Sequence, residues 1–420
     1  MVFSSGSAKE CEQVQQLPAA SSRSSRSGGA RQNGRSCLLV IYFVVANVFF
    51  GLVNIHLVTQ LDNSVGVDDN LNLVSPSLGG VLGTSERHET DYINNPNINV
   101  TDNRVLEYFR QVGMEVGEDS IQRLPTWTQI ETLIGDQPVL LGLERCIDFR
   151  NNIPPLRRML GSAGMFNSGT NLVTRLMKEN CVIPERYKEH GPHASKESYG
   201  IRWQTPWGKH TPAKFKYNHT APKNEETSKE DTLPIVTIRN PFDWMKSMCS
   251  HTYTAKWEMH ESGTRGKICP HLVYANSTSK KKVPVELKAK LAEQWLSYGS
   301  LAHLWNEWYA QYWKDANFPF LMVRLEDLVL RQYDTTKILC NCAGGVVPLK
   351  EKFIYIVKSA KQGPGHGKNE DRTDMLDAWM KFSKPMKSKA GFSDMDWEAS
   401  VSFLSRELME LMDYKYPPSE

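Results

Sequence analysis

Residues 234–247 read PIVTIRNPFDWMKS, and this stretch decides the fold expected for the chain. Its first five residues are apolar or β-branched, as in a strand that is covered on both faces of a parallel sheet. Arg239 ends the expected strand, and a helix carrying Ser247 is expected to follow. A guanidinium at the strand end and a hydroxyl on the helix can meet at one phosphate, because the first gives a forked contact and the second a neutral donor. The alternative is that Arg239 only pairs with Asp243.

A glycine-rich turn, GMFNSGTN at residues 164–171, lies upstream of this stretch. A strand is expected over residues 156–161 and helical spacing over residues 172–179, so the turn joins a strand to a helix. Such a turn exposes backbone N–H groups at the positive end of the helix dipole, which suits a phosphate.

The turn differs from a nucleoside triphosphatase loop in one residue. Gly164 and Gly169 have the P-loop spacing, but Thr170 stands where the triphosphatases have lysine. The next strand ends in Arg239 and not in the carboxylate that would hold Mg²⁺. The sequence therefore favours a bound phosphomonoester over a metal–triphosphate, and we expect no metal ion.

The remaining elements predict an α/β fold with a central parallel sheet between helices. A third strand is expected over residues 318–323, and a final helix over residues 400–411. Between the strands expected at residues 234–238 and 318–323, aromatic and apolar residues recur at three- and four-residue steps from Leu291 to Tyr312, which predicts one amphipathic helix packed on the core. Strands alternating with helices indicate parallel strands joined by crossover helices.

A membrane anchor is expected before this domain. The chain has 420 residues and a formal net charge of +3, too small for a general nucleic-acid binder. Residues 37–58 contain no Asp, Glu, Lys or Arg, and about 20 such residues span a bilayer. Basic residues precede the run and acidic ones follow it, so the positive-inside rule places the N-terminus in the cytosol. A cleaved signal peptide and a buried soluble helix are the alternatives.

These features predict four regions of the chain. Residues 1–36 would be a disordered cytosolic tail, residues 37–59 a transmembrane signal-anchor, residues 60–139 a flexible luminal stem and residues 140–420 the folded domain. A short helical patch between Val105 and Val116 could begin the folded part.

Glycosylation sites and cysteines follow the expected anchor. Three Asn-x-Ser/Thr sequons begin at Asn99, Asn218 and Asn276. An even number of cysteines also follows the anchor, in a compartment that would permit disulfides: Cys146, Cys181, Cys249, Cys269, Cys340 and Cys342. Their pairing is open from sequence. The spacing of Cys340 and Cys342 lacks the usual two-residue gap of a zinc site, so disulfides are favoured over metal.

With these motifs in this order, the chain resembles the sulfotransferases that use 3′-phosphoadenosine 5′-phosphosulfate (PAPS), especially the membrane-anchored Golgi members. The family's Arg-Asn-Pro-x-Asp-x-x-x-Ser segment matches residues 239–247 at every defined position, and its Pro-Lys-Ser-Gly-Thr loop is similar to residues 166–170. Residues 323–328 and 408–416 are weaker matches to its strand–helix junction and closing helix. The resemblance covers residues 157–417.

The resemblance implies PAPS as the donor and assigns residues to it. The loop would bind the 5′-phosphosulfate, Arg239 and Ser247 the 3′-phosphate, and Lys368 lies where the family closes over the nucleotide. The expected donor-binding residues are Asn167, Ser168, Gly169, Thr170, Asn171, Arg239, Ser247 and Lys368.

One position departs from the family. Asn167 stands where the loop usually carries a Lys or Arg that stabilises the leaving group, so Lys209 is the expected substitute cation. An acceptor hydroxyl must also lose its proton, and histidine has a suitable pKa. His210 stands in a segment similar to the family's Lys-x-His-x-Pro and is the expected base. Glu189 is a carboxylate alternative, and His190, His193 and His219 are expected in structural or exposed places.

The expected function is therefore sulfonate transfer to a hydroxyl, with a carbohydrate as the expected acceptor and the catalytic domain in the Golgi lumen. A binding protein that retains the nucleotide site without catalysis is the second hypothesis, because Asn167 brings no charge. A third is a glycosyltransferase with a metal-binding Asp394-Met395-Asp396, although no glycine-rich nucleotide turn stands beside it.

Overall fold

The computed structural model describes residues 103–258, 269–274, 282–360, 374–382 and 391–416. The expected cytosolic tail, the anchor at residues 37–59 and the stem up to residue 102 lie outside the described residues. Inside them, no helix combines the length and the apolar character that a membrane span requires.

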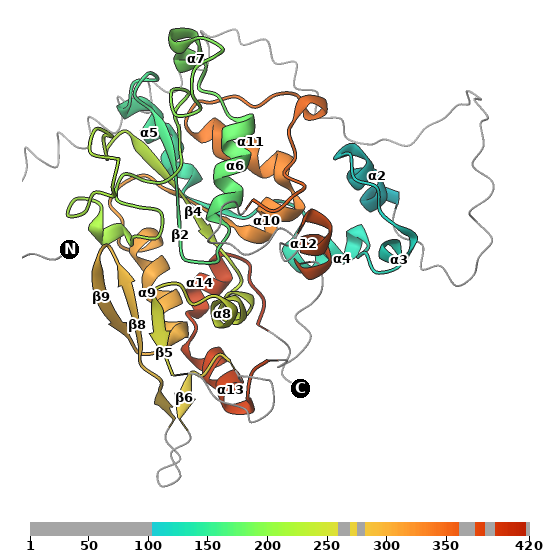
Figure 1. Cartoon of the computed structure of the whole chain (residues 1–420), viewed down its shortest axis with the longest axis vertical. Coiled ribbons are helices and arrows are strands. Elements are labelled where there is room, and N and C mark those ends of the chain that lie inside the picture. Colours follow the sequence, from blue (N-terminus) through green and yellow to red (C-terminus); the bar gives the residue numbers. More distant parts are fainter. Residues whose placement is uncertain (1–102, 259–268, 275–281, 361–373, 383–390, 417–420) are drawn as a thin grey trace, which may run out of the picture. The chain divides into compact units, whose positions relative to one another are not determined.

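A five-stranded sheet forms the centre of the described domain (Figure 1). Its strand order is β1-β10-β4-β2-β3, and the strands are β1 (Leu140–Leu141), β2 (Met159–Gly164), β3 (Ile201–Arg202), β4 (Thr232–Ile238) and β10 (Leu321–Arg324). The last four run parallel, whereas β1 pairs antiparallel with β10 at one edge. The α/β class is confirmed, and the sheet is mixed because of this edge strand.

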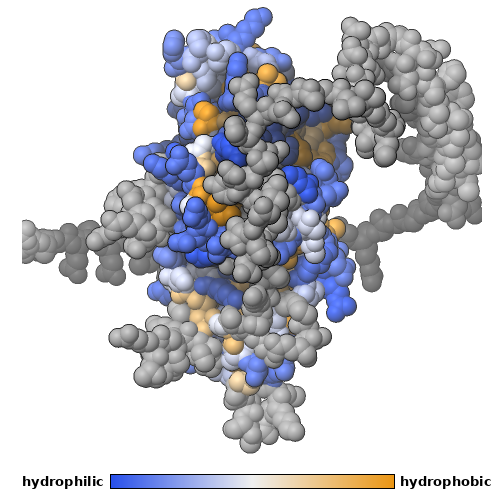
Figure 2. Space-filling view, turned by 90° about the vertical axis from the view of Figure 1, so that its right-hand side faces the viewer, coloured by the Kyte–Doolittle hydropathy of each residue, from blue (hydrophilic) through white to orange (hydrophobic). Residues whose placement is uncertain are grey.

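The central strand β4 is buried on both faces, as its run of apolar residues predicted. Val236 and Ile238 face one core, and Leu233 and Ile235 face the other. Helices α5 (Cys146–Asn152), α6 (Thr170–Asn180) and α11 (Gln332–Cys342) cover the second core. Helices α8 (Pro241–Ser250), α9 (Leu301–Trp313), α13 (Asp394–Phe403) and α14 (Arg406–Leu411) cover the first. On the face shown in Figure 2, polar residues predominate and apolar ones form separate patches.

The expected helix from Leu291 to Tyr312 is wrong in its first part. Strands β8 (Leu287–Leu291) and β9 (Gln294–Tyr298) form a hairpin there, joined to β5 (Ala255–Trp257) in a three-stranded sheet. Ala292 and Glu293 form the two-residue turn with φ of 49° and 62°. That conformation normally recruits Asn or Gly, so the turn has no local sequence signal. The aromatic stripe belongs to α9, where Trp305, Trp308 and Tyr312 are buried in the core.

The final helix is also divided. Helix α13 ends at Phe403, and Ser405 caps the start of α14 by accepting a hydrogen bond from the Leu408 amide. A serine at a new N-cap explains why one run of helical spacing forms two helices.

The folded unit begins before the expected boundary at residue 140. Helices α2 (Asn103–Gln111), α3 (Glu118–Ile121) and α4 (Trp127–Ile134) precede β1. Val105 and Phe109 pack with Trp379 of α12 (Met375–Phe382) in a third core cluster. The buried Arg324 guanidinium also donates to the Ile134 carbonyl at 2.6 Å. These contacts make residues 103–139 part of the domain and not of the stem.

Three disulfides pair the six cysteines that follow the expected anchor. Helix α11 carries Cys340 and Cys342, which bond to Cys181 and Cys146 respectively. The third joins Cys249, in α8, to Cys269. The disulfides confirm the preference for them over a zinc site, and the first two attach α11 to α5 and to the residue that follows α6.

Candidate active site

A cavity of about 480 Å³ lies at the carboxyl ends of the parallel strands. Each parallel strand is followed by a residue that lines it: Gly169 after β2, Trp203 after β3, Arg239 after β4 and Leu325 after β10. Strand β2 has β3 on one side and β4 on the other, so the chain order switches there. Ligands of open α/β sheets bind at such a switch point.

The glycine-rich turn forms one wall of the cavity. Gly164 has φ of 148°, and a Cβ there would lie 2.4 Å from Thr237 Oγ1 and 2.8 Å from the Thr237 carbonyl oxygen. Gly169 is the N-cap of α6 and has a left-handed backbone conformation. A Cβ at this position would clash with the Leu325 side chain. No side chain caps α6, so the first N–H groups of this helix face the cavity end without an intrahelical partner. The turn thus has the geometry of an anion site.

Arg239 supplies a buried cation to this site. The residue is 5% exposed, and its Nη1 donates to the Asn167 carbonyl oxygen at 3.2 Å. Its Nε and Nη2 atoms are buried and have no hydrogen-bond partner in the described protein. Burial lowers the pKa of Arg239, but a guanidinium stays charged in proteins. Arg239 and Asp243 form no salt bridge among the described residues, although the nearby Asp243 and Glu326 carboxylates partly offset the lowering of the Arg239 pKa. Nε and Nη2 therefore remain as two donors for a ligand.

Neighbouring helices hold the end of β4, and thereby Arg239, in place. The Trp305 indole donates to the Arg239 carbonyl oxygen at 3.2 Å, and the Tyr309 hydroxyl donates to the Thr237 carbonyl oxygen at 3.0 Å. The Asn240 amide donates to Glu326 at 3.0 Å. These contacts make the strand end rigid, which is the condition for a preorganised charge.

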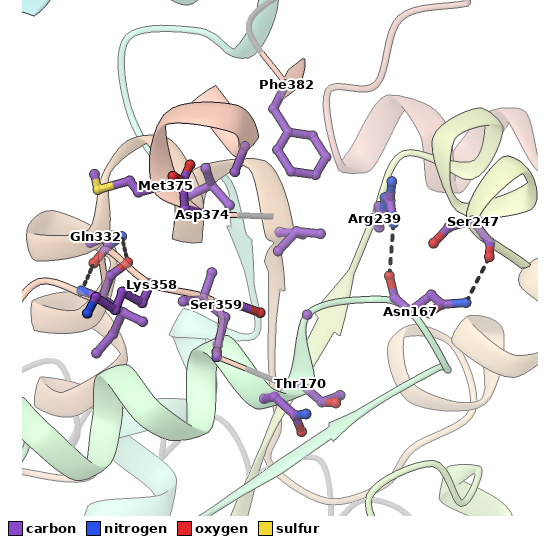
Figure 3. Close-up of a pocket in the computed structure, with 18 of the residues that line it drawn as sticks. Asn167, Thr170, Arg239, Ser247, Gln332, Lys358, Ser359, Asp374, Met375 and Phe382 are labelled. Atoms are coloured by element: carbon purple, nitrogen blue, oxygen red, sulfur yellow. Dashed lines mark hydrogen bonds between the residues drawn. The ribbon is translucent and has the colours of Figure 1, made fainter. Parts of the chain in front are cut away.

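Ser247 lines the same cavity as Arg239, as expected (Figure 3). The side-chain nitrogen of Asn167, however, donates within the protein and not into the cavity as expected. Its Nδ2 donates to the carbonyl oxygens of Ser247 at 3.2 Å and His251 at 3.0 Å, at the C-terminal end of α8. The amide is therefore engaged with the helix end, and its backbone carbonyl, not its side chain, contacts Arg239.

The other predicted loop residues divide into two groups. Gly169, Thr170 and Asn171 line the cavity. Ser168 is fully buried, and its hydroxyl donates to the Met165 carbonyl oxygen at 2.8 Å and is hydrogen-bonded to Thr237. Its hydroxyl therefore stabilises the turn against β4, and the assignment of Ser168 to the donor site stays a prediction. Lys368 lies outside the described residues.

Lys209 enters the cavity from a loop that β2 holds in place. The Gly164 amide donates to the Lys209 carbonyl oxygen at 2.9 Å. The ammonium donates to Asn171 Oδ1 at 2.9 Å and lies 3.3 Å from the centre of the Trp203 ring. Burial, with a smaller contribution from the nearby Lys178, lowers the pKa of Lys209 to about 7. A lysine with that pKa can change its charge near neutral pH.

His210 is held in one tautomer. Its Nδ1 lies 2.7 Å from the Gly164 carbonyl oxygen, and a carbonyl can only accept, so Nδ1 carries the proton. Nε2 then keeps its lone pair. Burial lowers the pKa of His210 to about 4, the carbonyl contact opposes this fall, and Lys209 adds to it. The imidazole is therefore neutral near pH 7 and can accept a proton.

The alternative bases lie elsewhere. Glu189 and His190 are exposed on α7 (Pro184–His190), His193 is exposed just beyond it, and His219 lies outside the cavity lining. Of the four histidines considered, only His210 lines the cavity.

The structure describes one of the three predicted glycosylation sites. Asn218 is exposed, as a glycosylation site must be, whereas Asn99 and Asn276 lie outside the described residues.

Asp396 accepts hydrogen bonds from the Leu272 and Val273 amides and the Ser393 hydroxyl. Its carboxylate thus orders backbone. In the described part of the chain, no group of three His, Cys, Asp or Glu residues is arranged to hold a metal ion.

Several lining residues had no recognisable signal in the sequence. Trp203 follows β3, which is only two residues long. Tyr253 follows α8, and Phe382 ends α12 with its ring 5.4 Å from the Arg239 guanidinium carbon. Gln332 and Lys358 line the opposite side of the cavity from Arg239 (Figure 3). Only the folded chain brings these segments together.

Comparison of the chain with protein-family models, curated proteins and solved structures finds no match.

Proposed function

We propose that this domain transfers a sulfonate group from PAPS to an acceptor hydroxyl. The observation that carries the proposal is the Arg239 guanidinium, which is buried at the cavity with two donor atoms unpartnered. Buried donor atoms of a cation that lack hydrogen-bond partners are costly, so their presence favours an anionic ligand that accepts from them. A phosphate on the ribose fits, because Ser247 lines the same cavity and the helix α6 N-terminus supplies a second anion site.

His210 would act as the base in this reaction. The acceptor hydroxyl gives its proton to His210 Nε2 while its oxygen forms a bond to sulfur. The bond between sulfur and the bridging oxygen of the 5′-phosphate breaks, and its electron pair stays on that oxygen. The products are a sulfate ester and 3′,5′-adenosine bisphosphate, and the imidazolium returns its proton to solvent. Positioned charges and N–H groups stabilise this step.

Lys209 would provide the cation that the loop lacks at Asn167. Its ammonium is held by Asn171, which belongs to the first turn of α6, so it lies next to the proposed 5′-phosphosulfate site. A charge placed there stabilises the bridging oxygen as sulfonate leaves.

Asn167 is also the observation that favours a second candidate, a nucleotide-binding protein without catalysis. Its amide is engaged at the end of α8, so the loop itself brings no positive side chain to the leaving group. In that case the protein would bind the nucleotide as tightly as an active enzyme would, but it would sulfate no acceptor.

The proposed location is the Golgi lumen, with a carbohydrate as acceptor and one N-terminal membrane anchor. The three disulfides and the exposed Asn218 sequon support an oxidising luminal compartment.

Calorimetric titration of the full-length chain tests the nucleotide site. We expect 3′,5′-adenosine bisphosphate to bind more tightly than ATP or UDP, without a need for Mg²⁺, because Arg239 and Ser247 would hold the ribose phosphate. Tighter binding of ATP or UDP would exclude the proposal. Radiolabelled sulfonate transfer to a glycan mixture then separates the enzyme from the binding protein.

The depressed pKa of Lys209 predicts that nucleotide binding takes up a proton. With a pKa of about 7, only about a tenth of Lys209 is charged at pH 8. The phosphates favour the charged form, so binding at pH 8 should bring close to one proton per nucleotide onto the protein. Calorimetry in buffers of different ionisation enthalpy measures this number. The Lys209→Met variant should lose the uptake, and Lys214→Met, an exposed lysine outside the cavity, should keep it. Equal uptake by Lys209→Met would remove Lys209 from the donor site.

A further inference from the structure

Two large aromatic side chains are partly exposed where they line the cavity. Trp203 is 49% exposed and Tyr253 is 44% exposed, yet both belong to the cavity lining. Exposed aromatic residues beside a site with a few polar groups are typical of surfaces that bind a ligand. Neither ring is among the residues assigned to the proposed donor site.

Each ring has a contact that leads to one member of the proposed catalytic pair. Trp203 contacts the Lys209 ammonium, 3.3 Å from the ring centre. Tyr253 stacks on Phe166 with ring centres 5.0 Å apart and planes within 10°, and Phe166 lies 4.7 Å from the His210 ring. A group held by both rings would therefore be next to the base and the cation.

Tyr253 is held in an uncommon conformation. Its φ is 53°, which costs a non-glycine residue free energy and persists only when surrounding contacts enforce it. Those contacts come from both sides: Asn167 Nδ2 donates to the His251 carbonyl oxygen, and Thr254 Oγ1 donates to the Lys290 carbonyl oxygen at 2.9 Å. Asn167 thus links the phosphate-binding turn to the segment that presents Tyr253. This gives the asparagine a structural function at a position where the family carries a cation.

We propose that Trp203 and Tyr253 form the acceptor subsite and that it takes a pyranose ring of a glycan. This inference rests on the proposed function and names the residues that would bind the acceptor at the same site. A pyranose has faces of C–H groups that pack on aromatic faces and an edge of hydroxyls that needs polar partners. Gln204 and Asn171 line the cavity next to Trp203 and Lys209. Their amide oxygens accept hydrogen bonds from Lys209, and their amide nitrogens offer donors to sugar hydroxyls. A phenolic acceptor has one hydroxyl and would leave these polar groups unmatched.

Saturation-transfer NMR on the full-length chain tests the subsite without requiring turnover. The protein is saturated with 3′,5′-adenosine bisphosphate, and the probes are methyl pyranosides of galactose, glucose and N-acetylglucosamine, with p-nitrophenol as the phenolic comparison. We expect signal transfer onto pyranoside C–H protons, reduced about fivefold or more in Trp203→Ala and in Tyr253→Ala. Thermal unfolding close to that of the unmodified chain shows that each variant is folded. Saturation with the bisphosphate is checked for each variant separately, because Trp203 contacts Lys209 of the proposed donor site.

Two matched variants serve as controls. Trp295 is 51% exposed with Lys256 Nζ 4.9 Å from its ring centre, and Tyr187 is 42% exposed; neither lines the cavity. Trp295→Ala and Tyr187→Ala should leave pyranoside signals unchanged. Absence of pyranoside signals, a preference for the phenol, or equal signals in Trp203→Ala and Tyr253→Ala would overturn the subsite. Failure of the bisphosphate to bind would instead overturn the proposed function.

Discussion

Replacing Arg239 by methionine should abolish the preference of the protein for a nucleotide that carries a 3′-phosphate. Truncating one partner of a buried, charged hydrogen bond costs about 2–5 kcal/mol, or roughly 30- to 4,000-fold in affinity. The Nε and Nη2 atoms of Arg239 are buried without partners, so a bound phosphate would receive both. Lysine at this position should recover only part of the loss, because an ammonium cannot make a forked contact.

The measurement is the ratio of the dissociation constants of 5′-AMP and 3′,5′-adenosine bisphosphate. The unmodified chain should show a large ratio, and Arg239→Met a ratio near one, because only the 3′-phosphate interaction is removed. A general loss of structure would weaken both nucleotides and leave the ratio unchanged. This comparison therefore separates a ligand contact from a structural role.

The stability of the same variant provides an independent check. Arg239→Met removes a buried cation that lacks two hydrogen bonds, so the melting temperature without nucleotide should not fall.

Arg202, at the end of the neighbouring strand β3, hydrogen-bonds to Asn224 and does not line the cavity. Arg202→Met should keep the nucleotide ratio. An unchanged ratio in Arg239→Met would contradict the assignment of the 3′-phosphate.

The strand–helix junctions could be predicted from the sequence because their signals are local. Residues 232–238 form a buried strand, and α8 begins at Pro241 with Asn240 as its cap. The cavity likewise contains Arg239 and Ser247, which the spacing placed together. The local signal is missing where a strand has only one buried face or where a turn lacks Gly and Asn, as at Ala292. For this reason the prediction of one helix from Leu291 to Tyr312 failed in its first part.

Side-chain directions inside the turn could not be predicted, because tertiary contacts determine them. Ser168 faces Thr237 of β4, and Asn167 faces the end of α8, although both lie in the loop that matches the phosphate-binding pattern. Trp203 and Tyr253 reach the cavity from segments without periodicity. The motif predicts an anion site, and the fold determines which atoms of the motif face the cavity.

Replacing His210 by glutamine should reduce sulfonate transfer about 10²- to 10⁴-fold, the usual contribution of a general base. Binding of 3′,5′-adenosine bisphosphate should stay within about threefold, because His210 would contact the acceptor and not the nucleotide phosphates. His193→Gln, at an exposed histidine outside the cavity, is the control and should retain full turnover. Near-normal turnover in His210→Gln would remove it as the base.

The pH dependence of turnover distinguishes a buried His210 from an ordinary histidine. The base must be neutral, and burial lowers the pKa of His210 to about 4. The kcat/KM for the donor, which reports the free enzyme, should therefore not fall through His210 until the pH nears 4. A loss of activity centred near the ordinary histidine pKa of about 6.5 would contradict the burial of this imidazole.

The same shift predicts a change in stability that requires no catalysis. Between pH 6.5 and 4 the unfolded chain protonates His210 and the folded chain does not, so the unfolded state binds more protons. The free energy of unfolding contributed by the neutral imidazole is present above about pH 6.5 and is lost as the pH falls through 4. Denaturant titrations across this window should show a weaker pH dependence in His210→Gln than in the unmodified chain. Parallel curves would mean that the pKa of His210 is not lowered in the folded state, and the assignment of a neutral imidazole down to pH 4 would then have to be abandoned.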